Sequence, residues 1–226
     1  MSGNGSQDSC ALNFPENGID TNSKNNVFIQ GPGLVRRFNG NGIVVSGNHS
    51  SVEGVAITSI CAEAIVVSGS YNEIEGNSIS RDSLDVSEAN HFFAGIFVSA
   101  PGGHNSILNN EVVGAGVYPI TAGQGGFGIF VGEPGAPSNN NLIQENDASG
   151  NPGSGIFITL GSTGNTVRHN QALGGVDLGD IFDGNDPPAN TYDNNLCEAS
   201  FIGPSQQNIC QLPNIAGHRN GPVDRN

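Results

Sequence analysis

Residues 128–172 read GIFVGEPGAPSNNNLIQENDASGNPGSGIFITLGSTGNTVRHNQA, and one pattern occurs in them twice. The pattern is GIF followed by Val or Ile, then a polar turn, then an Asn-x-Ile/Val-x-x-Asn phrase and a small apolar residue. Repetition at a spacing of roughly 20 to 35 residues is typical of stacked supersecondary units, each of which buries its apolar face against its neighbours. The stretch therefore predicts a solenoid.

The same two phrases recur along most of the chain and alternate with each other. The first phrase aligns a column of isoleucines, namely Ile43, Ile65, Ile96, Ile129, Ile156 and, in a degraded copy, Ile181. The second aligns a column of asparagines at its closing bend, namely Asn77, Asn110, Asn146, Asn170 and Asn195. Each phrase is short and alternates as a strand does, and no long helix-period pattern separates like strands. We therefore expect parallel coils in which like residues stack and the asparagines form a hydrogen-bonded ladder.

In these phrases the chain resembles the right-handed parallel β-helix family with PbH1-type repeats, which includes pectate lyases, mannuronan epimerases and NosD-like periplasmic proteins. The resemblance covers roughly residues 18–200 and rests on GIVV, AIVV, GIFV, GIFV and GIFI with their partner Asn phrases. It implies an all-β, single-stranded right-handed parallel β-helix of about 7 coils with long loops on one side. Residues 1–226 would form one domain, with 201–226 as a C-terminal tail or cap. Because the same coils carry many functions, the fold leaves the activity open.

The composition excludes some partners. The net charge is −14, with only seven Lys and Arg residues in 226, so the chain is a poor ligand for nucleic acid or for an anionic membrane. No apolar run is long enough to span a membrane. The first coil begins abruptly near Cys10, so we expect that a secretory leader and an N-terminal cap lie outside this sequence.

The four cysteines have no zinc-ligand spacing. Cys197 and Cys210 lie close together near the end, where a disulfide could stabilise the last turn by about 2 to 4 kcal/mol. The alternative is buried free thiols in a reducing cell. The sequence alone leaves the state of Cys10 and Cys61 open as well.

Unequal coil lengths point to one side of the solenoid. From Ile65 to Ile96 the chain runs 31 residues, and from Ile96 to Ile129 it runs 33. The excess falls after the Asn bend, in residues 80–93 and 113–126, at the same angular position of adjacent coils. We therefore expect two loops that project side by side. Long loops on a rigid scaffold often carry binding or chemistry, although these could also simply cover apolar surface.

An apolar column lies beside these loops. In the first phrase, Ile and Val face the core, so the residue between them points outward. These residues are Val44, Val66, Phe97, Phe130, Phe157 and Phe182. A contiguous exposed apolar column indicates a ligand, a partner or a lid. We expect the loops to cover part of it and leave a groove, in which the four phenylalanines contact a sugar ring or another flat ligand.

The lyase and epimerase resemblance implies proton abstraction next to a uronate carboxylate. That reaction needs a base, a cation that neutralises the carboxylate, and a proton donor to the leaving oxygen. Arg81 or Arg37 could hold the carboxylate, and His91 or Tyr118 could serve as base or donor. His104 is a further candidate for contact with the substrate. No contiguous segment matches a lyase motif.

Two groups of carboxylates could bind a metal. Asp82, Asp85 and Glu88 are spaced so that they could offer hard oxygen ligands to Ca²⁺, although nothing in the sequence makes a cofactor necessary. A second group, Asp177, Asp180, Asp183 and Asp186, recurs with period three. In that register it more readily ends the solenoid, because the polar turn and the Pro pair after it interrupt strand pairing.

Two functions from different classes remain. In the first, the chain is a secreted or periplasmic enzyme that cleaves or epimerises a polysaccharide in a groove beside loops 80–93 and 113–126. In the second, it is a non-catalytic module whose aromatic column binds a glycan, a partner chain or a hydrophobic ligand. Whether it is an enzyme at all stays open. A second copy could also pair with the uncapped N-terminal coil.

Overall fold

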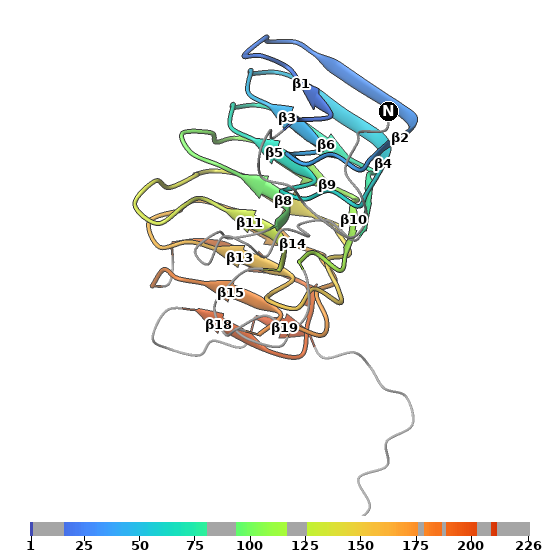
Figure 1. Ribbon diagram of the computed structural model, residues 1–226. Helices are drawn as coiled ribbons and strands as arrows, with labels where there is room; N and C mark the ends of the chain where they lie inside the picture. The colour runs from blue at the N-terminus through green and yellow to red at the C-terminus, as the bar shows by residue number, and fades with distance from the viewer. Residues whose placement is uncertain are drawn as a thin grey trace, which may run out of the picture.

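The computed structural model describes Met1 and residues 16–80, 94–116, 126–175, 179–186, 189–202 and 209–211. Within these residues the chain forms short strands joined by turns, and it forms no helix. The strands of successive coils pair in parallel and stack along one axis. Figure 1 shows this stack running from β1 at the blue N-terminal end to β18 and β19 at the orange-red end.

One wall of the solenoid, which we call sheet I, has eight parallel strands in spatial order. They are β1 (Ile19–Asp20), β3 (Ile43–Val45), β5 (Ile65–Val67), β8 (Ala94–Val98), β11 (Phe127–Val131), β13 (Ile156–Ile158), β15 (Ile181–Asp183) and β18 (Ser200–Ile202). Their register places the isoleucines of the first phrase directly opposite one another, from Ile43 to Ile181. The predicted isoleucine column is confirmed.

The other wall, sheet II, has nine strands and turns a corner. They are β2 (Phe28–Arg36), β4 (Ser51–Thr58), β6 (Glu73–Glu75), β7 (Ser78–Ser80), β9 (Ser106–Leu108), β10 (Glu111–Val113), β12 (Leu142–Gln144), β14 (Thr166–Arg168) and β16 (Thr191–Asp193). The first half of β4 pairs with β6 and its second half pairs with β7, so the long strands span both sides of the bend. A small third sheet joins β17 (Asn195–Leu196) to β19 (Cys210–Gln211).

Asparagine side chains link the coils inside the bends. At the bend within sheet II, Nδ2 of Asn77 donates to Oδ1 of Asn110 at 3.0 Å, and the same bond continues through Asn146 and Asn170 to Asn195. A second ladder joins Asn105, Asn141, Asn165 and Asn190 at the bend between the two walls. These asparagines are buried or nearly so, and the bonds satisfy backbone groups that the bends would otherwise leave unpaired.

The core consists of stacked apolar columns, and one of them ends in a polar residue near the C-terminal end. Val131 and Ile158 face the core in one column, and the next member is the buried Asp183. Asp183 accepts hydrogen bonds from the Tyr192 hydroxyl at 2.6 Å, from Nδ2 of Asn190 at 2.9 Å, and from the backbone and side chain of Asn185. The carboxylate is therefore buried but fully paired, as a buried charge must be.

The turn that contains Asp180 and Asp183 does not end the solenoid, contrary to our prediction. Asp180 is buried and accepts hydrogen bonds from the backbone N–H groups of Gly175, Glu198 and Ala199. Strand β18 then pairs with β15 in the same parallel register. Asp180 thus bonds to the backbone of the following coil, and strand pairing continues beyond it. Asp177 lies outside the described residues, and a metal role for this series has no support among the described ones.

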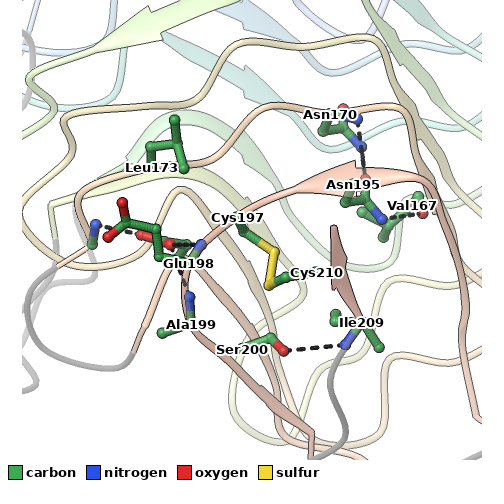
Figure 2. Close-up of a disulfide and its surroundings, with 12 residues drawn as sticks. Val167, Asn170, Leu173, Asn195, Cys197, Glu198, Ala199, Ser200, Ile209 and Cys210 are labelled. Carbon is green, nitrogen blue, oxygen red and sulfur yellow. Dashed lines mark hydrogen bonds between the residues drawn. A yellow bond between two sulfur atoms is a disulfide. The ribbon is translucent and has the colours of Figure 1, made fainter. Parts of the chain in front are cut away.

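Cys197 and Cys210 form a disulfide that closes this end of the core, and Figure 2 shows it below and to the left of Asn170 and Asn195, the last asparagines of the ladder. Cys197 is fully buried and belongs to the main apolar cluster. Cys61 is also disulfide-bonded, and no described cysteine is free. The free-thiol alternative is therefore wrong for the described cysteines.

Candidate functional site

The outward column of sheet I is a stack of aromatic rings. Phe97 and Phe130 meet edge to face with ring centroids 5.4 Å apart, and Phe130 and Phe157 are stacked at 5.0 Å. Phe157 and Phe182 continue the stack at 4.6 Å. Toward the N-terminal end the column continues through Val66 and Val44 to Asp20. Apart from Asp20, the described column is apolar and holds no titratable group.

Part of this column is packed against other side chains and is not open surface. The Phe127 ring lies against Phe130 and Phe157, with centroids 5.1 and 4.7 Å away. Phe127 and Phe130 are buried and form, with Ala94, a second apolar cluster separate from the main core. Phe130 therefore reaches no ligand in this conformation. The half-buried Phe97, Phe157 and Phe182 are the column residues that could.

The two long loops leave sheet II side by side and rejoin sheet I side by side. Ser80 and Val113, the last strand residues before the loops, are register partners. Ala94 and Phe127, the first strand residues after them, are also partners. The loops thus begin and end as neighbours, which is the arrangement that the coil lengths predicted. Residues 81–93 and 117–125 themselves lie outside the described residues.

Six predicted site residues fall in those two segments. Arg81, His91, Tyr118, Asp82, Asp85 and Glu88 lie outside the described residues, so their mutual geometry stays a prediction. Among the described residues, no group of three or more His, Cys, Asp or Glu side chains could hold a metal ion.

Arg37 is exposed at the end of β2, near the edge from which the loops leave. Its neighbour Arg36 pairs with Thr58, and Thr58 pairs in turn with Ser80. Arg37 has a positive φ of 61°, and its backbone N–H donates to Ser59 in the next coil. Arg37 therefore lies at this edge, two coils before the first long loop. Its role stays a prediction.

His104 belongs to a feature that sequence reasoning missed. It is exposed on the turn before β9 and stacks on Tyr71, with ring centroids 4.9 Å apart and planes within 6°. Tyr71 stacks in turn on His49 at 5.2 Å. The three rings occupy the same turn of three successive coils. The available signal was the aromatic or His residue directly before the first Asn or Ser of each second phrase, in GNHSSV, SYNEI and GHNSI.

Three glutamates on sheet II lie beside this stack. Glu53 is the register partner of Glu75, and Glu73 lies two residues from Tyr71 on the same strand as Glu75. Partial burial raises the pKa of Glu73, and the nearby Glu75 and Glu53 carboxylates raise it further. This part of the surface is therefore negatively charged at neutral pH, and Glu73 is easier to protonate than an isolated glutamate.

The stacked parallel coils described above are typical of a known protein family. The family model described as "Right handed beta helix region" matches residues 17–196. The chain belongs to the right-handed β-helix family. Comparison with curated proteins finds no significant match.

Two solved structures resemble this β-helix. One is an alginate lyase from Paenibacillus sp. str. FPU-7, with 18% sequence identity and a TM-score of 0.56 over 71% of this chain and 53% of that chain. The other is the pectate lyase Pel9A, with 15% identity and a TM-score of 0.45 over 79% of this chain and 51% of that chain. The β-helix thus spans about half the length of each. At such identity the alginate lyase likeness shows the fold alone. None of the described residues forms a helix that could cross a membrane.

Proposed function

We propose that this β-helix is a carbohydrate-active protein that acts on a uronate polysaccharide beside loops 80–93 and 113–126. The observation that carries the proposal is the paired departure of these loops from sheet II and their paired return to β8 and β11, the strands that carry Phe97 and Phe130. A rigid wall flanked by two neighbouring loops is a common setting for a substrate site. The likeness to an alginate lyase adds support at the level of the fold.

The proposed reaction is β-elimination or epimerisation. His91 or Tyr118 removes the proton on the carbon next to the uronate carboxylate, and Arg81 or Arg37 neutralises the charge that develops on that carboxylate. In elimination, the neighbouring C–O bond then breaks, a C=C bond forms, and the leaving oxygen takes a proton. In epimerisation, the proton returns to the opposite face. Phe97, Phe157 and Phe182 are assigned contacts with the polymer, and Ca²⁺ bound by Asp82, Asp85 and Glu88 could help the arginine to neutralise the carboxylate.

The disulfides favour a secreted or periplasmic location. Cys197 and Cys210 are bonded, and Cys61 is bonded as well. Disulfides persist in oxidising compartments and are rare in the cytosol. Both candidate functions are consistent with that setting, because their carbohydrate ligands are found outside the cell.

The elimination reaction can be tested directly. The wild-type protein is incubated with a panel of uronate polymers, with and without Ca²⁺, and the unsaturated product is followed by its ultraviolet absorbance. We expect turnover on at least one polymer and a loss of about 10²-fold or more in Arg81→Ala and in His91→Ala. Arg168→Ala is the matched control. Arg168 lies on β14, outside both loops, and its side chain donates a hydrogen bond to Gln144. An inert panel, assayed also by NMR for epimerised product, would contradict the proposal.

A non-catalytic binding module is the second candidate. It is favoured by the described column of sheet I, which is apolar except for Asp20 and offers no acid, base or cation along β3 to β15. On this alternative the wild-type protein retains a polymer without changing it. Phe97→Leu and Phe182→Leu keep the column apolar but remove its half-buried rings, so they should weaken retention. Unchanged retention in both would argue against the aromatic column as the binding surface.

A further inference from the structure

A second aromatic surface lies on the turn between the two walls, away from the column of sheet I. It comprises His49, Tyr71 and His104, which occupy the same turn of three successive coils, and Phe28 of the preceding coil, which lies two residues further on at the start of β2 as the register partner of Ser51. Phe28 is 73% exposed and Tyr71 is 55% exposed, and both histidines are exposed. We call these four residues the turn strip. They are the largest group of exposed rings in the described part of the chain.

At three of these positions the backbone adopts a conformation that favours Gly or Asn over a residue with a ring. His49, Tyr71 and His104 have φ values of 56°, 59° and 57°, in the left-handed region that Gly and Asn adopt most readily and that is unusual for Tyr. At the corresponding turn, other coils use Asn26, Asn140 and Gly164, which adopt this geometry at lower cost. Three rings at strained positions indicate that the side chains themselves contribute something that Asn or Gly would not.

Stacking leaves the polar edges of these rings available. The ring faces of Tyr71 are occupied by His49 and His104, so the stack presents its edges to solvent. Within the described residues, the imidazole nitrogens of both histidines and the Tyr71 hydroxyl have no hydrogen-bond partner. The strip thus offers donors and acceptors on rings whose centroids lie 4.9 to 5.2 Å apart, with Phe28 exposed on β2 of the preceding coil.

The spacing and the charge together select the ligand. One ring per coil along the solenoid axis suits an elongated ligand whose polar groups repeat at about the length of one pyranose unit. Hydroxyl groups can bind the ring edges, and the C–H face of a sugar can stack on Phe28. Glu53, Glu73 and Glu75 flank the strip, so a polyanion would be repelled from this surface.

We propose that the turn strip binds an extended polysaccharide that lacks carboxylates. This goes beyond the proposed reaction, because it assigns a second surface with a different ligand from the uronate substrate. It would attach the protein to a neutral glycan while the loops act elsewhere. His104 accordingly belongs to this strip and contacts the second ligand.

The test is affinity gel electrophoresis of the full chain in gels that contain a soluble neutral polymer, namely xylan, galactomannan or mixed-linkage glucan, with polygalacturonate as the anionic arm. We expect retardation by at least one neutral polymer. His49→Asn and Tyr71→Asn should each weaken it about tenfold or more. These variants introduce the residue that other coils use at this turn, so thermal unfolding should show no loss of stability. His169→Asn is the matched control, since His169 is exposed with φ of 55° on the other bend, and it should bind like the wild type.

Three results would overturn the proposal: no retardation by any neutral polymer, equal retardation of the wild type and the Tyr71→Asn variant, or Tyr71-dependent retardation by polygalacturonate alone. A Tyr71-dependent dimer in size-exclusion chromatography would also overturn it, because the strip would then bind a second copy. Retention is scored without turnover. A failure here therefore leaves the elimination assay unaffected, and an inert elimination assay leaves the binding result standing.

Discussion

At the residue scale, single asparagines hold neighbouring coils together. Nδ2 of Asn146 donates to the backbone oxygen of Ile107 at 2.8 Å, and its Oδ1 accepts from the backbone N–H of Asn110 at 3.0 Å. Asn146→Ala would leave both buried backbone groups unpaired. We expect a loss of about 2 to 4 kcal/mol in the free energy of unfolding, measured by urea denaturation. Glu145→Gly is the neighbouring control and should stabilise slightly, because Glu145 has φ of 57°. Equal stability of Asn146→Ala and the wild type would contradict the ladder's role.

Tyr192 should make the protein sensitive to alkali. Burial raises its pKa well above the ordinary value, and the adjacent Asp183 carboxylate raises it further. The unfolded chain releases this proton near pH 10 while the folded chain retains it, so stability is present below that pH and falls above it. The loss attributable to Tyr192 should be about 1.4 kcal/mol per pH unit.

This dependence can be isolated by comparing wild type and Tyr192→Phe in urea at pH 9 and pH 11. The variant should be less stable at pH 9, because Asp183 loses its hydroxyl partner. Its further loss between the two values should be smaller than that of the wild type. Parallel losses in the two proteins would show that Tyr192 is not the responsible group.

At the scale of strands, the outward column of sheet I should behave as a small core. Phe130 is fully buried among three rings. Phe130→Ala should therefore cost about 3 to 5 kcal/mol in unfolding free energy. Val66, at the same outward position of β5, is half-buried with Phe97 on one side and Val44 on the other, so Val66→Ala should cost only about 1 kcal/mol. Similar losses of unfolding free energy in the two variants would mean that the ring contacts of Phe130 add little to stability.

The sequence predicted the members of this column but not their burial. Alternation within one strand reports which face a side chain occupies, and the repeat reports what lies above and below it. Whether that face is then covered depends on residues outside the strand. The same limit explains Asp183, whose polarity suggested an end to the strands although its register position lies in the core.

At the scale of the whole molecule, a solenoid should lose structure locally. Each coil contacts its neighbours and little else, so damage at one end has limited effect at the other. Cys210→Ser removes the disulfide near β17 and should cost about 2 to 4 kcal/mol at that end. Hydrogen exchange should accelerate in β15 and β16 and remain close to wild type in β3 and β5. Uniform acceleration along the chain would show instead that the solenoid unfolds as a single unit.

The repeat in the sequence by itself determined the fold, the register of the isoleucine and asparagine columns, and the adjacency of the two long loops. It could do so because every coil repeats one local backbone geometry, so like residues must stack wherever the spacing returns. The tertiary structure alone decided that Phe130 is buried, that Asp183 is paired inside the core, and that His49, Tyr71 and His104 form an exposed stack. These properties depend on which side chains from different coils approach one another and on how much solvent they leave, and spacing along the chain carries no measure of either.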